Sequence, residues 1–209
     1  MKKDNCMKQS LHSRRIIMKM AVAGAVTAAF PLTFSAGPAK AETPKGGSRM
    51  LTVYYSRTGN TRDMAGRIHR LAGGDIVELE TVSPYPAEYR ATTEQAKKEL
   101  QANFYPPLKV TVEDISAYDV IFVGSPSWWG TFASPVRGFL AQHNFSGKKL
   151  APFITHEGSG MGRSVADMQS LCPGATILEG LAVRGGSVGA AQSEIVQWLN
   201  RIGVNKQGG

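Results

Sequence analysis

The sequence predicts an α/β fold in which a five-stranded parallel sheet lies between two layers of helices. Two observations lead to this prediction. Segments with strand character alternate along the chain with segments whose apolar residues recur at helical spacing. The segment at 118–124, YDVIFVG, is a nearly continuous apolar run, as expected for a central strand that is covered on both faces. Together they favour a three-layer α/β/α domain.

The first strand and the first helix of this pattern are joined by a polar turn. Residues 50–55 form an apolar run, and the helix after them begins near Thr61. One face of that helix is apolar, with residues spaced i, i+1, i+4 and i+7: Met64, Ala65, Ile68 and Leu71. Gly73 and Gly74 end it, and residues 75–81 alternate apolar with acidic side chains, as a more exposed strand does.

Residues 83–107 interrupt the simple alternation. A helix rich in Ala, Glu, Gln and Lys is predicted over 88–103, between two segments that contain proline. We interpret it as a surface crossover helix that joins the second strand to the third. The tyrosines of this segment are assigned to packing, with a place at the rim of a site as the alternative: Tyr85, Tyr89 and Tyr105.

The second half of the domain continues the alternation. Its expected strands are 118–124, 149–155 and 175–183. Its expected helices are 134–142, 164–171 and 190–202. Two loops follow strand ends here, one at 125–132 and a glycine-rich one at 156–163. Because the carboxyl ends of parallel strands meet at one edge of a sheet, we expect both loops to lie close to the turn after the first strand.

That turn has the composition of an anion site. It consists of Ser56, Arg57, Thr58, Gly59, Asn60 and Thr61. Hydroxyl groups, the freedom of glycine to take positive φ, and the amides at the start of a helix all suit a phosphate. The turn has neither the G-x-x-x-x-G-K-[ST] pattern nor the G-x-G-x-x-G fingerprint of other nucleotide sites. The alternative interpretation is a polar turn with a helix cap.

The loop at 125–132 carries two adjacent tryptophans. Its candidate binding residues are Pro126, Ser127, Trp128, Trp129 and Gly130. Such loops lie on the surface, where a tryptophan pair is hard to explain as core, so an aromatic wall for a planar ring is the favoured interpretation. For one of the two, packing against the crossover helix is the alternative.

The glycine-rich loop offers close backbone contact to the edge of a ring. Its candidate binding residues are His156, Glu157, Gly158, Ser159 and Gly160. A His beside a Glu also suggests acid–base catalysis as a less favoured alternative. No Ser/His/Asp grouping accompanies this pair, and the chain has no Cys/His cluster with metal-ligand spacing, so we predict no catalytic residue and no metal site.

These three segments resemble, in the same order, those of the flavodoxins, which are small FMN-binding electron carriers. The turn matches their pattern [ST]-x-T-G-x-T, and the resemblance covers roughly residues 50–202. It implies a flavodoxin-like sheet of order 2-1-3-4-5 with FMN at the switch point between strands one and three. It also implies that the turn holds the phosphate, that an aromatic of the second loop stacks on the isoalloxazine, and that the third loop contacts its pyrimidine end.

Two features depart from that family. Arg57 lies inside the turn, where flavodoxins use amides and hydroxyls, so it either pairs with the phosphate or points to solvent. Flavodoxins are also strongly acidic, whereas this chain has a formal net charge of +8. Removal of residues 1–41, with seven Lys or Arg and one acid, leaves +2. The basic pI is therefore partly a property of the leader, and we predict no nucleic-acid partner.

The leader is predicted to be a signal peptide over 1–41. Residues 13–19, SRRIIMK, resemble the twin-arginine export motif S-R-R-x-F-L-K, and Ala39-Lys40-Ala41 is an A-x-A cleavage site. The apolar stretch between them is shorter than the ~20 residues of a membrane-spanning helix, so we expect no membrane span in the mature protein. Translation from Met18 would omit both arginines, and the two starts are left open.

The expected organisation is therefore a twin-arginine signal peptide, a linker at 42–48 and a flavodoxin-like domain at 49–204. The twin-arginine route moves folded proteins, which agrees with a cofactor inserted before export. We predict a periplasmic electron-transfer flavoprotein whose partner is a redox protein or a small electron acceptor. An FMN-dependent NAD(P)H:acceptor oxidoreductase of quinone type and a flavin-free binding module are the alternatives, because fold alone does not decide function.

Overall fold

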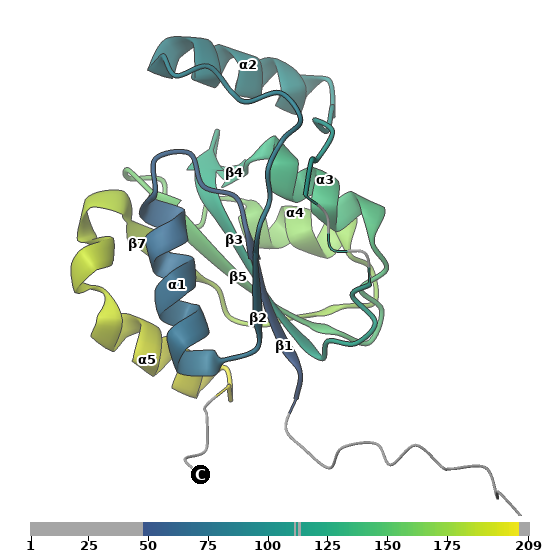
Figure 1. Cartoon of the computed structure of the whole chain (residues 1–209), viewed down its shortest axis with the longest axis vertical. Helices are drawn as coiled ribbons and strands as arrows, with labels where there is room; N and C mark the ends of the chain where they lie inside the picture. Colours follow the sequence, from purple (N-terminus) through teal and green to yellow (C-terminus); the bar gives the residue numbers. More distant parts are fainter. Residues whose placement is uncertain (1–47, 111, 113, 205–209) are drawn as a thin grey trace, which may run out of the picture. The chain divides into compact units, whose positions relative to one another are not determined.

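A computed structural model of the chain describes residues 48–110, 112 and 114–204 (Figure 1). The predicted signal peptide and all but the last residue of the predicted linker lie outside these residues. Within the described part of the chain, no helix is long and apolar enough to cross a membrane.

The sheet has the predicted order. Its parallel strands follow one another as β2 (Asp75–Glu78), β1 (Met50–Tyr54), β3 (Val120–Trp128) and β5 (Lys149–His156), and the last position is shared by β6 (Thr176–Ile177) and β7 (Leu181–Arg184). The order 2-1-3-4-5 is confirmed. The strand count is higher than predicted, because the described residues form seven strands in this sheet.

One additional strand arises because the predicted strand 175–183 is broken. Its first part pairs with β5 up to Leu150↔Ile177, and pairing resumes at Phe153↔Leu181. The gap lies opposite Pro152, which has no N–H group to donate to a neighbouring strand. The interrupted ladder therefore has a local chemical cause that lies on the partner strand.

The other additional strand corrects the predicted loop at 125–132. β3 runs on to Trp128, beyond the predicted end at Gly124, and pairs with β5 as far as Pro126↔Thr155. It then turns back into β4 (Thr131–Phe132), with which it pairs antiparallel. The turn residues, Trp129 and Gly130, have φ of 54° and 76°, which is typical of a tight type I′ hairpin turn.

Two hydrophobic cores confirm the three layers. α1 (Asn60–Ala72) and α5 (Gln192–Arg201) cover one face of the sheet, where Phe122 and Trp198 are fully buried. α3 (Ser134–Gln142) and α4 (Ser164–Leu171) cover the other face, around Ile121, Phe139 and Met168. The predicted bounds of α3 and α4 are confirmed. A 3₁₀ helix, η1 (Gly185–Ala190), precedes α5, which starts two residues later than predicted.

Helix α2 (Tyr89–Gln101) forms where a crossover helix was predicted, but it covers neither face of the sheet. Figure 1 shows it lying across the end of the molecule to which the carboxyl ends of the strands point. Its first turn is capped by Glu88, whose carboxylate accepts hydrogen bonds from the amides of Arg90 and Ala91. This placement brings α2 next to the loops that follow the strands.

Candidate functional site

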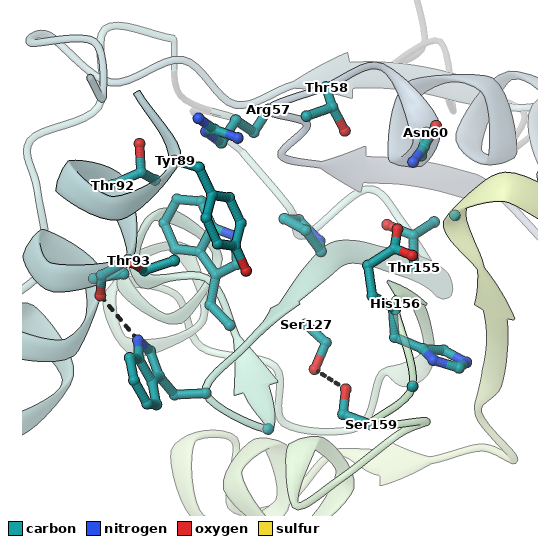
Figure 2. Close-up of a pocket in the computed structure, with 18 residues that line it drawn as sticks. Arg57, Thr58, Asn60, Tyr89, Thr92, Thr93, Ser127, Thr155, His156 and Ser159 are labelled. Atoms are coloured by element: carbon teal, nitrogen blue, oxygen red, sulfur yellow. Dashed lines mark hydrogen bonds between the residues drawn. The ribbon is translucent and has the colours of Figure 1, made fainter. Parts of the chain in front are cut away.

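A cavity of about 640 Å³ lies at this end of the sheet. Figure 2 shows its walls: the turn after β1, the β3–β4 turn, the loop after β5, and helix α2. The predicted site residues that line it are Arg57, Thr58, Asn60, Pro126, Ser127, Trp128, Trp129, Gly130, His156, Glu157, Gly158 and Ser159. The structure thus brings all three predicted loops together around one space.

Three predicted residues of the first turn shape it without lining the cavity. The Ser56 hydroxyl accepts hydrogen bonds of 3.2 Å from the amides of Gly59 and Arg62. Gly59 has a φ of 97°, a conformation that glycine adopts without strain. Thr61 is buried, and its hydroxyl lies 2.7 Å from that of Thr155 at the end of β5. These contacts hold the start of α1 against the carboxyl end of β5.

The start of α1 keeps amide donors for a ligand. The first amides of any helix have no partner within the helix. Here the Arg62 amide is bonded to Ser56, and that of Asp63 donates to the Gly59 carbonyl. The amides of Asn60 and Thr61 are left at the positive end of a 13-residue helix, beside the cavity-lining Thr58. This end of the cavity is suited to an anion.

The side chain of Arg57 contacts residues at the beginning of α2. Its guanidinium donates a 2.8 Å hydrogen bond to the carbonyl of Ala87, just before α2. The same guanidinium lies over the ring of Tyr89, 6.0 Å from its centroid. Arg57 therefore links the first turn to the beginning of α2.

The two tryptophans have different environments. Trp128 is half-buried and packs edge-on against Tyr55 and Tyr85, with ring centroids 5.6 Å and 4.8 Å away. Trp129 is 50% exposed and donates from its indole nitrogen to the Thr93 carbonyl of α2. The alternative of packing against the crossover helix therefore applies to Trp129.

Two tyrosines behind Trp128 keep their protons at ordinary pH. Burial raises the pKa of Tyr55 to about 12. Burial also raises the pKa of Tyr85, and the hydrogen bond from its hydroxyl to the buried carboxylate of Glu99 adds to this effect. Tyr85 is a packing residue, as predicted. The aromatic group behind the cavity wall is thus neutral.

The loop after β5 is joined to its neighbours by side-chain contacts. The hydroxyls of Ser127 and Ser159 lie 2.7 Å apart (Figure 2). The Glu157 carboxylate and the Asn60 amide both lie where a side chain on Gly185 would project. Gly160, with a φ of 58°, is outside the cavity lining.

His156 is poorly placed for acid–base work in the cavity. In Figure 2 its ring points away from Thr58 and Ser127. Its Nδ1 atom is buried and has no hydrogen-bond partner among the described residues. Within the same residues, no group of three or more His, Cys, Asp or Glu side chains could hold a metal.

Sequence reasoning missed one wall of the cavity. The missed lining residues are Thr92, Thr93 and Ala96 of α2, together with Thr155 and Gly185. Tyr89 of α2 also lines the cavity, and a place at the rim of a site was the less favoured alternative for it. The lining residues of α2 are spaced i, i+3, i+4 and i+7, so they form one face of the helix. That spacing is visible in the sequence, but only the position of α2 shows that this face meets the cavity.

Solved structures resemble this chain over the whole domain. A candidate flavoprotein from Bacteroides eggerthii is 27% identical, with a TM-score of 0.64, over 76% of this chain and 100% of that one. A flavoprotein from Lactobacillus acidophilus, solved in complex with FMN, is 26% identical, with a TM-score of 0.58, over 73% of this chain and 99% of that one. A candidate flavoprotein from Bacteroides uniformis, 24% identical with a TM-score of 0.66 over 74% and 99%, shares the fold.

No curated protein sequence matches the chain. The family model for flavodoxin matches residues 49–202, which is nearly all of the described domain. The three loops at the carboxyl end of a sheet of order 2-1-3-4-5 agree with this match. The chain belongs to the flavodoxin family.

Proposed function

We propose that the protein binds FMN in this cavity and works as an exported electron carrier. The observation that carries the proposal is that an anion-binding helix start, an aromatic wall and a glycine-containing loop border the same space. The relative from Lactobacillus acidophilus, which was solved with FMN, supports the choice of ligand. FMN has a phosphate at one end and a planar ring system at the other.

The residues of the first turn fit the phosphate. The Asn60 and Thr61 amides and the Thr58 hydroxyl would hold it at the positive end of α1, as in other anion sites at helix starts. Gly59 is free to take the φ that this approach requires. The positive charge of Arg57 lies on the same wall and favours a dianion.

The opposite part of the cavity fits the ring. Trp128 and Pro126 provide apolar surface, and Gly158 lets the backbone come close to a ring edge, since no atom lies within 4 Å of the position of a side chain there. When bound, the flavin supplies the electron chemistry, and the protein supplies orientation and environment. The tyrosines behind Trp128 stay protonated and add no negative charge of their own on that side.

A carrier role is supported by what surrounds the ring position. The ring of His156 points away from Thr58 and Ser127, and the carboxylate of Glu157 lies beside Asn60 near the first turn. Neither side chain is therefore placed to move a proton to or from a substrate above the flavin. We propose that electrons arrive from and leave to a redox protein or a small acceptor.

The test uses purified protein reconstituted with FMN. A yellow, non-covalent complex is expected, and its flavin should keep its colour when NADH or NADPH is mixed in without oxygen. A chemically reduced sample should pass its electrons to an external acceptor. Rapid bleaching by NADH or NADPH would favour an oxidoreductase, and a protein that stays colourless with FMN would favour a flavin-free binding module.

Export is a separate part of the proposal, supported by the twin-arginine-like leader and its A-x-A site. The test fuses residues 1–41 to a reporter protein that is active only after export in the folded state. The fusion should be active, and replacing both Arg14 and Arg15 by lysine should abolish the activity. If activity survives that double replacement, the twin-arginine route is wrong.

A further inference from the structure

We infer that Tyr89 of α2 is an aromatic wall of the FMN site, and that the isoalloxazine ring is held between Tyr89 and the side of the cavity formed by Trp128. The inference rests on the proposed FMN binding and deepens it. It assigns a ring-stacking role to a residue that belongs to none of the three loops and for which the sequence favoured packing over a place at the rim of the site.

Tyr89 is exposed to an unusual degree for its size and position. The side chain is 70% exposed, the largest fraction among the exposed large apolar side chains of the described residues. It nevertheless lines the cavity, and Figure 2 shows its ring pointing from α2 into that space. An exposed aromatic ring in a cavity wall has apolar surface that a planar ligand would cover.

The ring of Tyr89 is held in place from one side. The guanidinium of Arg57 lies over it at 6.0 Å and is itself bonded to the carbonyl of Ala87, two residues earlier. The Glu88 cap fixes the helix start between them. Because a cation occupies one face of the ring, the opposite face is available for stacking.

Neither tryptophan occupies the position opposite Trp128 at which a second aromatic ring would stack on the flavin. The indole of Trp129 is tied to the Thr93 carbonyl, and the ammonium of Lys97 lies 5.1 Å from its ring centroid, so Trp129 attaches the β3–β4 turn to α2. Trp128 is held edge-on by two tyrosines on its far side. Among the described residues, no ring contact joins Tyr89 to Trp128, although both line the cavity.

The rest of the α2 face suits a flat apolar ring. The hydroxyl of Thr92 donates to the carbonyl of Pro86, and that of Thr93 donates to the carbonyl of Arg90. Their hydroxyl protons are thus donated to the backbone, and Ala96 one turn further on has only a methyl group. Next to Tyr89, the helix offers small apolar groups over which a ring plane can lie.

The experiment compares Tyr89→Ala with Phe104→Ala, which removes an aromatic of similar size that is 52% exposed and outside the cavity lining. Binding of FMN and of riboflavin is measured by flavin fluorescence titration. Tyr89→Ala should weaken both ligands by about 2- to 12-fold, as expected for the loss of one aromatic stacking contact. Phe104→Ala should bind both as the wild type does.

Further variants separate the ring from the hydroxyl and from the phosphate. Tyr89→Phe keeps the ring and should bind like the wild type, whereas Thr58→Ala should weaken FMN more than riboflavin. Wild-type affinity in Tyr89→Ala would overturn the inference while FMN binding stands, and so would an equal loss in Tyr89→Phe and Tyr89→Ala. Failure of the wild type to bind FMN would instead overturn the proposed function.

Discussion

The indole nitrogen of Trp129 donates a 3.0 Å hydrogen bond to the main-chain carbonyl of Thr93. This bond joins the β3–β4 turn to helix α2, two elements that are separated in the sequence by most of one strand and a long connection. Trp129 also has a φ of 54°, so the turn holds a large side chain in a left-handed backbone conformation. Both Trp129 and Thr93 line the cavity, so this hydrogen bond closes one side of it.

Replacing Trp129 by phenylalanine removes this hydrogen bond and keeps an aromatic ring. An intramolecular hydrogen bond contributes about 0.5–1.5 kcal/mol, so local opening of α2 should become roughly 2- to 12-fold easier. Hydrogen exchange of the α2 amides measures it. As the control, the amides of α5, which packs beside α1 on one face of the sheet, should exchange at the wild-type rate. Unchanged exchange in α2 would show that this hydrogen bond does not hold the helix.

Gly59 and Gly147 form a matched pair for testing the first turn. Both have positive φ, 97° and 75°, and a side chain on either would meet no atom within 4 Å. Replacement by alanine should therefore cost about 1–2 kcal/mol of folding free energy at each site, from backbone strain alone. Only Gly59→Ala should weaken FMN binding, because only Gly59 lies in the turn that would hold the phosphate.

Thermal unfolding of the two variants measures the loss of folding free energy, and FMN titration measures the change in affinity. If Gly147→Ala weakened FMN binding as much as Gly59→Ala, the loss would come from general destabilisation, and the role of the first turn would be contradicted.

Gly185 lines the cavity at the point where its own segment approaches Asn60 and Glu157. A side chain on it would collide with the Asn60 amide and come within 2.7 Å of the Glu157 carboxylate. Gly185→Ala should push one of these side chains aside and lower FMN affinity. Gly186→Ala, next to it, would meet no atom within 4 Å and should bind FMN as the wild type does. Equal affinities of the two variants would show that the close approach at Gly185 has no bearing on the ligand.

Acid should loosen the start of α2. Hydrogen bonds from the amides of Ala91 and Arg90 hold the pKa of the Glu88 carboxyl below its ordinary value of 4.5. The folded state thus favours the carboxylate, so the cap contributes fully above the pKa of the unfolded chain and is lost as the pH falls through the lower folded pKa. Protection of the Arg90 and Ala91 amides against hydrogen exchange should fall in that acid range.

Glu88→Gln provides the comparison, because its side chain does not titrate. In this variant the two amides should be less protected at neutral pH, and their protection should lack the step that the wild type shows in acid. A step of equal size in both proteins would assign the acid response to another group.

Much of the fold follows from local pattern. The bounds of α3 were predictable because Ser134 and Pro135 mark a helix start, and those of α4 because a glycine-rich loop precedes Ser164. The meeting of the three loops was predictable because parallel strands bring their carboxyl ends to one edge. The broken last strand was not, because its cause, Pro152, lies on the neighbouring strand.

The sequence by itself therefore determined the layers, the strand order implied by its family resemblance, and the three loops that line the cavity. Only the tertiary structure decided where α2 lies, and with it the positions of Tyr89 and Trp129. The periodicity of a helix shows which residues share a face, but what that face packs against depends on contacts with residues far away in the chain. For this protein, that long-range placement turns a predicted crossover helix into a wall of the site.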